Sequence, residues 1–203
     1  MSVFVKICGL TTPEAVEAAV SGGANAIGFV FAESPRRVSV GQACELTRLV
    51  PPAIVRVAVM RHPSRKEWAE VAQGFQPDWV QTDAEDFAGL EIGAKVRRLP
   101  VYRDEPTLDT RVIANEERIL FESPTSGEGR QADWNRAGTL ATKTELVLAG
   151  GLNSRNVEAA IRQVQPWGVD VSSGVERSRG EKDPEQIAAF IRAVRKLECS
   201  DAG

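Results

Sequence analysis

The first residues that could do chemistry are Lys6 and Cys8, at the end of an apolar, β-branched run that breaks at Gly9. Alternation along a strand puts both side chains on one face, so a positive charge would lie near the sulfur. A nearby cation favours the thiolate, which is the form of cysteine that accepts a proton or attacks. The alternative is that Cys8 is a small buried apolar residue, as most free cysteines are. In a parallel α/β protein, however, the end of a strand is where chemistry is done.

The composition excludes several classes of protein. The chain has 203 residues, 42% of them hydrophobic, with a net charge of −3 and no isolated cluster of basic residues, so we expect neither a nucleic-acid nor a membrane partner. No apolar run is long enough to span a bilayer, and the N-terminus lacks a signal pattern. The three cysteines are far apart and His62 is the only histidine. We therefore expect neither disulfides nor a structural zinc site, and we expect a cytoplasmic location.

The elements that must position Lys6 and Cys8 alternate along the chain. Strand-like segments lie at residues 3–8, 26–31, 54–60, 79–81, 96–101, 118–122, 145–149 and 168–171. Helix-like patterns separate them, weakly so on either side of residues 96–101, and a last helix follows the cap Asp183. Eight strands and about eight helices predict a single (β/α)8 TIM barrel. A doubly wound open sheet is the alternative, but no dinucleotide or P-loop motif follows any strand.

The prediction is one domain over residues 1–203, whose last few residues form a frayed tail. Glycine- or serine-rich turns follow the last two strands, at Gly150, Gly151, Ser172, Ser173 and Gly174. Loops at these two positions cradle a phosphate in many barrels through their backbone N–H groups. The alternative is that these residues only make tight turns.

Asp170 alternates with two valines, so it faces the barrel interior together with Ser172. It could belong to a substrate site, form a salt bridge with Lys6 on the neighbouring first strand, or do both.

Five segments, in this order and at suitable spacing, resemble the phosphoribosylanthranilate isomerases of tryptophan biosynthesis: residues 6–9 (KICG), 28–31 (GFVF), 34–38 (SPRRV), 148–153 (LAGGLN) and 169–176 (VDVSSGVE). The resemblance implies a TIM barrel that converts N-(5-phosphoribosyl)anthranilate into 1-(2-carboxyphenylamino)-1-deoxyribulose 5-phosphate. This Amadori rearrangement needs a general acid and a general base, but no metal or redox cofactor. The resemblance also implies that Cys8 is the base, that Arg36 contacts the anthranilate carboxylate, and that Asp170 lies in the substrate site. We assign Lys6 to the same site.

The sequence departs from the family at two strand ends. The family typically carries Asp at the end of the sixth strand, where this chain offers Glu122, which is one methylene longer. We assign Glu122 as the acid, which requires a raised pKa such as partial burial supplies; the alternative is an exposed strand-end carboxylate. The glycine loop at residues 127–130 and the following Asp133 match the family. At the fourth strand, Asp83 stands where the family commonly has His, which removes one polar group from the barrel mouth.

Three functions remain open from the sequence. The first is a monofunctional isomerase that acts on a small phosphorylated substrate, as a monomer or a homodimer. The second is a bifunctional isomerase that also acts on the related aminoaldose of histidine biosynthesis. A cysteine base and the lack of a clear second phosphate loop in the first half argue against it. The third is a degenerate barrel that binds phosphorylated anthranilates without turnover, or serves as a scaffold.

Overall fold

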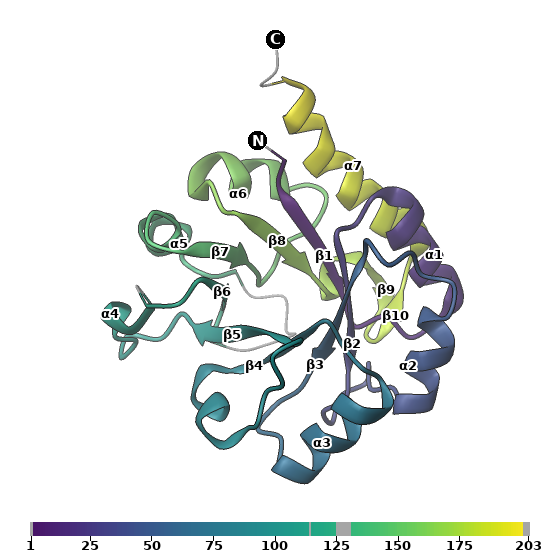
Figure 1. The fold of residues 1–203 in the computed structure, drawn as a ribbon. Coiled ribbons are helices and arrows are strands. Elements are labelled where there is room, and N and C mark those ends of the chain that lie inside the picture. Colours follow the sequence, from purple (N-terminus) through teal and green to yellow (C-terminus); the bar gives the residue numbers. More distant parts are fainter. Residues whose placement is uncertain (1, 114, 125–130, 201–203) are drawn as a thin grey trace.

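Eight parallel strands close into a barrel in chain order, as Figure 1 shows from one end of the barrel. The computed structural model describes residues 2–113, 115–124 and 131–200. The predicted glycine loop at 127–130 and the predicted tail at 201–203 lie outside these residues. The barrel strands are β1 (Phe4–Cys8), β2 (Ala26–Val30), β3 (Val55–Val59), β4 (Trp79–Asp83), β5 (Arg97–Arg103), β6 (Arg118–Glu122), β7 (Glu145–Leu148) and β8 (Gly168–Val171). The predicted TIM barrel is confirmed, and the open-sheet alternative is wrong.

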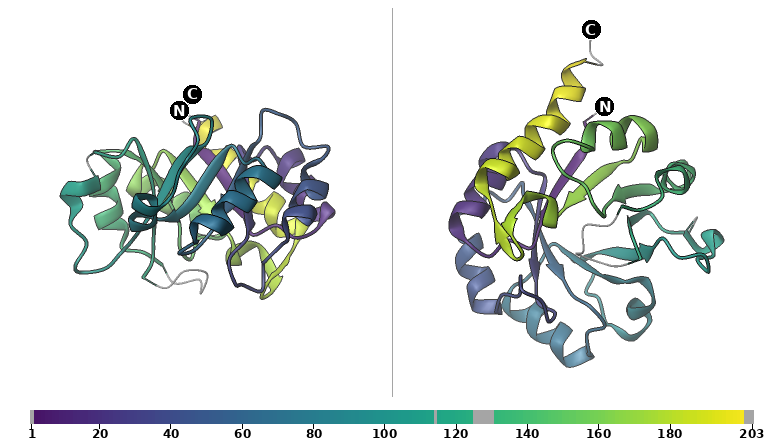
Figure 2. Two further views of the ribbon diagram at one scale, coloured as in Figure 1. Left: turned by 60° about the horizontal axis from the view of Figure 1, so that its bottom comes forward. Right: turned by 180° about the vertical axis from the view of Figure 1, so that it is seen from behind.

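The helices form an outer layer around the barrel (Figures 1 and 2). Side-chain caps start several of them; Thr12, for example, accepts a hydrogen bond from the Ala15 N–H at 3.3 Å. The long C-terminal helix packs beside the first helix, which closes the helical layer between the two ends of the chain. The α-helices are α1 (Pro13–Gly22), α2 (Val40–Thr47), α3 (Arg65–Gly74), α4 (Thr110–Ile113), α5 (Trp134–Ala141), α6 (Val157–Val164) and α7 (Pro184–Ser200). Within the described residues, no helix has the length and apolar character that crossing a bilayer requires.

The helical layer is thin beside β5, where the sequence pattern was also weakest. The β4–β5 connection contains only the 3-10 helix η1 (Ala84–Gly89), and α4 after β5 is four residues long. The predicted weak helices therefore exist only as these short pieces. By contrast, β4 extends to Asp83, two residues beyond the predicted end, because Thr82 and Asp83 continue the parallel pairing with β5.

A hairpin that the sequence did not predict follows the barrel. After β8 come a 3-10 turn η2 (Ser173–Val175) and the antiparallel strands β9 (Glu176–Ser178) and β10 (Glu181–Lys182). Asp183 then caps α7 as predicted, accepting hydrogen bonds from the N–H groups of Glu185 and Gln186. The hairpin has no periodic apolar pattern, which is why it reads as a loop in the sequence.

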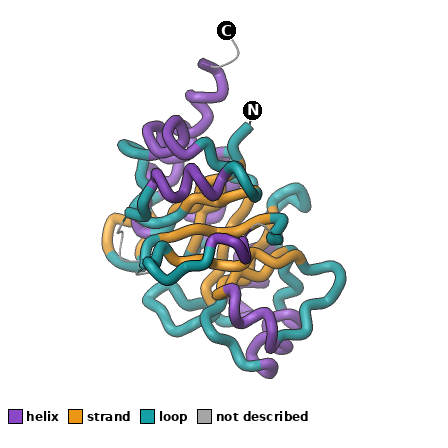
Figure 3. Tube along the Cα trace, turned by 90° about the vertical axis from the view of Figure 1, so that its left-hand side faces the viewer, coloured by secondary structure: helices purple, strands orange, loops and turns teal. Residues whose placement is uncertain are grey.

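The apolar core has two layers, one inside the barrel and one between the barrel and its helices. Figure 3 shows the strands enclosed between helical segments. Inside the barrel the buried residues are Ala26, Val57, Trp79, Leu99, Val101, Leu120, Val147 and Ala149. The N-terminal end of the barrel is filled by aromatic rings, with Phe4 stacked on Trp167 at 4.5 Å between ring centroids. The inward positions nearest the C-terminal ends of the strands carry polar residues, and these form the candidate site.

Candidate active site

Five strands carry, at their C-terminal end or next to it, an inward-facing residue that can take part in chemistry. Along each strand these residues continue the alternation of the interior apolar residues, for instance Leu120 followed by Glu122 on β6. The C-terminal ends of parallel strands meet at one rim, and that rim carries the active site in TIM barrels. The inward residues at or beside the strand ends are Cys8 on β1, Asp83 on β4, Arg103 on β5, Glu122 on β6 and Asp170 on β8.

Lys6 and Asp170 form a buried ion pair beneath the sulfur of Cys8. The Lys6 Nζ lies 2.7 Å from Asp170 Oδ1, and the lysine side chain is fully buried. The two residues are register partners on β1 and β8, which fixes their approach. The predicted salt bridge is therefore present. Burial alone would lower the pKa of Lys6, but the charges of Asp170 and Cys8 outweigh it and raise that pKa.

The expected thiolate is not the favoured form of Cys8. Burial is the largest influence and raises the pKa of the thiol, Lys6 lowers it, and the charge of Asp170 raises it again. The net effect is a raised pKa: Lys6 shifts Cys8 towards the thiolate as expected, but burial and Asp170 outweigh that shift. The physical reason is that the Lys6 ammonium is already paired with Asp170, while Cys8 is only 6% exposed.

Glu122 and Asp170 line the same cavity, of about 40 Å³, together with the two predicted phosphate loops. The Glu122 side chain is 13% exposed, and one carboxyl oxygen lies 3.5 Å from a guanidinium nitrogen of Arg103. Its backbone oxygen accepts a hydrogen bond from the Asp104 N–H. The alternative of an exposed strand-end carboxylate is therefore wrong, and the structure brings Glu122 to the rim where Cys8 and Asp170 lie.

The two loops after β7 and β8 meet at this cavity. Gly150 and Gly151 have φ values of 87° and 66°, a left-handed conformation that glycine adopts without strain and that turns successive N–H groups to one side. Asn156 fixes the first loop by donating a hydrogen bond to the Gly151 carbonyl at 2.8 Å. The helix after Ser172 is only the three-residue turn η2, so no long helix dipole supports the second loop.

Lys182 in the hairpin stabilises the second loop. Its fully buried ammonium donates to the Ser172 carbonyl at 2.8 Å and hydroxyl at 3.1 Å. It also lies 2.6 Å from the Glu176 carboxylate. Burial is the largest influence on this ammonium and lowers the pKa of Lys182. The sequence analysis missed both Lys182 and Glu176, because neither lies at a strand end of the barrel.

Arg36, the predicted carboxylate contact, is engaged by Glu176. Its Nε and one terminal nitrogen donate to the two Glu176 oxygens at 2.6 and 2.9 Å, and its side chain is 8% exposed. Burial alone would raise the pKa of Glu176, but hydrogen bonds from Arg36 and Lys182 outweigh it and lower that pKa to about 2. Two of the five guanidinium N–H donors are used in this pair, and no other side-chain hydrogen bond of Arg36 is found among the described residues.

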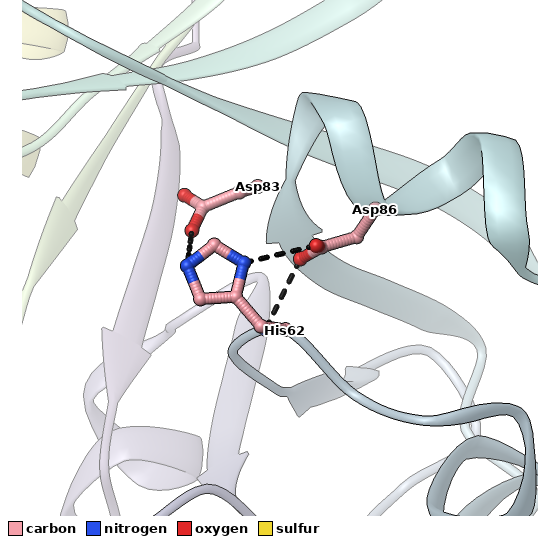
Figure 4. A group of neighbouring side chains, drawn as sticks. All are labelled: His62, Asp83 and Asp86. Carbon is pink, nitrogen blue, oxygen red and sulfur yellow. Dashed lines mark hydrogen bonds and ion pairs between the residues drawn. The ribbon is translucent and has the colours of Figure 1, made fainter.

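Asp83 and His62 form a second polar group at the rim, shown in Figure 4. The His62 Nε2 lies 3.3 Å from Asp83, and its Nδ1 lies 3.0 Å from Asp86 on η1. On its other side, Asp83 accepts a hydrogen bond from Arg103 at 2.6 Å. The sequence predicted that Asp83 in place of the family's His removes one polar group from the barrel mouth, and the structure shows that His62, in the loop after β3, supplies an imidazole beside Asp83. The position of Arg103 two residues beyond Val101 on the interior face was a signal that could have identified it.

Comparisons with known proteins point to one family. The family model for N-(5'-phosphoribosyl)anthranilate (PRA) isomerase matches residues 5–193. A protein named N-(5'-phosphoribosyl)anthranilate isomerase from Streptococcus pneumoniae (strain Taiwan19F-14) is 40% identical, over 94% of this chain and 95% of its own length.

Two solved structures are similar over nearly the whole chain. The phosphoribosylanthranilate isomerase of Thermotoga maritima superposes with a TM-score of 0.83 and 32% identity, covering 96% of this chain and all of that one. A phosphoribosylanthranilate isomerase in complex with reduced 1-(o-carboxyphenylamino)-1-deoxyribulose 5-phosphate has a TM-score of 0.80 and 31% identity, over 96% and 100% of the two chains.

Proposed function

The chain belongs to the N-(5'-phosphoribosyl)anthranilate isomerase family, and we propose that it performs this rearrangement with Cys8 as general base and Glu122 as general acid. Membership in the family makes it an isomerase of tryptophan biosynthesis. The proposed substrate is the small phosphorylated anthranilate glycoside, and the separate cysteines favour action in a reducing cytoplasm. Apart from cleavage of the bond between C1 and the ring oxygen, the proposed reaction consists of proton transfers.

The proposed reaction opens the sugar ring and then moves a proton. Glu122 gives its proton to the furanose ring oxygen while the bond from that oxygen to C1 breaks, which produces a Schiff base to the anthranilate nitrogen. Cys8 as thiolate then removes the proton from C2, and the electron pair of that bond forms the enolamine. Tautomerisation returns a proton to C1 and leaves the ketone at C2, so the product is an isomer of the substrate. General acid–base steps of this kind contribute about 10²–10⁴-fold each.

The polar groups under Cys8 have a defined part in this scheme. Only the thiolate can accept the C2 proton, and the raised pKa of Cys8 makes that form a minority near neutral pH. Lys6 and Lys182 both favour the thiolate through their charge. Asp170 holds the Lys6 ammonium in place beneath the sulfur, with 2.7 Å between the Lys6 Nζ and the Asp170 Oδ1. The two ammonium groups therefore stabilise the thiolate that must be present before the C2 proton is transferred, and the transfer converts it to the thiol.

Substrate binding is proposed at two anchors. The phosphate would accept hydrogen bonds from backbone N–H groups of two loops, Gly150-Gly151 and Ser172-Ser173-Gly174. Except for Gly174, these residues line one cavity together with Glu122 and Asp170. The anthranilate carboxylate would take the donors of Arg36 that Glu176 leaves open. The glutamate presets the guanidinium, so little side-chain entropy is lost on binding.

The observation that carries the proposal is the shared cavity, which Glu122 and Asp170 line together with the two loops proposed to bind phosphate. Asp170 forms an ion pair with Lys6, which precedes Cys8 on the inner face of β1. The direct test is to generate phosphoribosylanthranilate enzymatically, add the purified protein and follow the anthranilate fluorescence. We expect turnover, and its loss in Glu122→Gln. Full activity in Glu122→Gln would refute the acid assignment. Binding of the reduced product without any turnover of substrate would instead support a degenerate barrel.

A further inference from the structure

A row of charged side chains runs along the rim from the end of β3 to the end of β6. Arg103 lies in its middle, 2.6 Å from Asp83 on one side and 3.5 Å from Glu122 on the other. Arg103 and Glu122 are register partners on β5 and β6. The side chains of Arg103, Asp83 and Glu122 are 19%, 11% and 13% exposed, so solvent screens their charges only partly.

This arrangement poses a problem for a general acid. A cation next to a carboxyl favours its ionised form, whereas the proposed role of Glu122 requires a proton. Arg103, however, makes its short hydrogen bond to Asp83 and the longer ion pair to Glu122. The Asp83 carboxylate therefore neutralises most of the guanidinium charge, while the second terminal nitrogen still holds the Glu122 side chain at the rim.

His62 completes the row on the far side of Asp83 (Figure 4). A hydrogen bond from the ring to Asp86 is the largest of the influences that raise the pKa of His62. Among the described residues, His62, Asp83 and Asp86 are also the group whose ligand atoms could surround a metal ion. Both ring nitrogens face carboxylates, and Arg103 occupies one oxygen of Asp83, so the group forms a network of ion pairs that holds Asp83 in place.

We propose that Arg103 is a positioning residue for Glu122: it fixes the carboxyl at the cavity wall, and Asp83 offsets its charge so that Glu122 can take up a proton. This inference rests on the proposed function for the role of Glu122 as the acid. The geometry needs a forked side chain that can reach two carboxylates at once, which arginine provides and lysine does not.

Two other acidic residues lie near Glu122: Asp170 lines the same cavity, and Asp104 donates its backbone N–H to the Glu122 carbonyl. Asp170 on β8 lines the same cavity, but its charge is matched by Lys6 on β1. Asp104, the next residue after Arg103, pairs its carboxylate with Arg136 at 3.0 Å. Among the described residues, the Asp83–Arg103 pair is therefore the one whose substitution should most directly change the charge next to Glu122.

The test is to titrate the Glu122 carboxyl in the ligand-free protein by ¹³C NMR with labelled glutamate, assigning the signal with Glu122→Gln. Arg103→Met removes the cation, so the pKa of Glu122 should rise. Asp83→Asn leaves the guanidinium uncompensated, so that pKa should fall. Shifts in the same direction, or no shift in either variant, would overturn the inference. Because no substrate is present, this result does not depend on whether Glu122 is the acid.

Kinetics test the positioning role separately. Arg103→Met should lower kcat by about ten- to a hundredfold, the loss associated with a misplacement near 1 Å, with a smaller change in KM. Arg103→Lys keeps the charge and should recover only part of kcat. Arg111→Met, which breaks an exposed ion pair with Asp109, is the matched control and should leave kcat unchanged. Wild-type kcat in both Arg103 variants, with folding verified by circular dichroism, would refute the positioning role.

Discussion

The Lys6 ammonium lies 2.7 Å from the Asp170 carboxylate, and the lysine side chain is fully buried inside the barrel. The two residues are 164 positions apart in the chain and join the first barrel strand to the last. The pair therefore helps to close the barrel, and it also sets the charge beside Cys8.

Lys6→Met should destabilise the protein by about 3–5 kcal/mol, because it leaves the Asp170 charge buried without a partner. Urea unfolding measures this change in the free energy of unfolding. The double variant Lys6→Met/Asp170→Asn removes both charges and should be more stable than Lys6→Met alone. If the double variant is instead the less stable of the two, the buried charge is not the origin of the loss.

Cys8→Ser should lower kcat by about 10²–10⁴-fold, because a serine hydroxyl is a far weaker proton acceptor than a thiolate. The change in fluorescence of the anthranilate group as the substrate is converted to product measures the rate. Cys44→Ser is the matched control: Cys44 is exposed and bonds only to the Gly74 carbonyl among the hydrogen bonds described, so full activity is expected. A Cys8→Ser enzyme with more than a tenth of wild-type kcat would contradict the base assignment.

The thiol of Cys8 should react slowly with iodoacetamide at neutral pH and faster as the pH rises past the ordinary thiol value of about 8.5. Burial raises the pKa of Cys8, and only the thiolate is alkylated. Asp170→Asn removes a charge that raises this pKa, so alkylation at a given pH should become faster. Mass spectrometry of the modified peptide separates Cys8 from the other cysteines. Slower alkylation in Asp170→Asn would reverse the sign assigned to Asp170.

Gly174→Ala should disrupt the loop after β8, the second of the two loops proposed to bind phosphate. A Cβ at this position would lie 1.8 Å from the Leu152 carbonyl oxygen, which is backbone and cannot move aside without shifting the first loop. We expect a loss of stability of about 1–3 kcal/mol and a raised KM for the phosphorylated substrate. Gly41→Ala in α2, where a Cβ would meet nothing within 4 Å, is the control and should be neutral or slightly stabilising. Unchanged KM in Gly174→Ala would count against phosphate binding at this loop.

The protein should lose stability as the pH falls from about 4.5 towards 2, in part because Glu176 becomes protonated. The pKa of Glu176 is lowered from 4.5 to about 2 in the folded protein. Its contribution to the free energy of unfolding is therefore fully present above pH 4.5, the unfolded-state pKa, and is lost as the pH falls to the folded-state pKa. At 1.36 kcal/mol per pKa unit, the contribution is on the order of 3 kcal/mol. Glu176→Gln should flatten this part of the curve of unfolding free energy against pH. An equally steep curve in that variant would assign the acid sensitivity to other carboxylates.

The sequence alone determined the barrel, because alternating apolar strands and amphipathic helices are local patterns that each segment carries by itself. Strand periodicity also put Lys6 and Cys8 on one face and Asp170 towards the barrel interior before the strands were assembled, whereas Glu122 was assigned through the resemblance to the family. The weak pattern around β5 belongs to a part of the wall with little helix, where local signals are few.

Only the tertiary structure decided which charges meet. Arg36 and Glu176 are 140 positions apart in the chain, and His62 and Asp86 are 24 positions apart. No local sequence pattern therefore relates the members of either pair. The sign of the Cys8 pKa shift was decided in the same way: Lys6 is a neighbour in sequence, but burial and Asp170 come from the assembled barrel. Arg103 was overlooked for this reason too, since its part depends on two carboxylates that lie on the strands either side of it. Charge interactions depend on distance and burial, and both are set by packing.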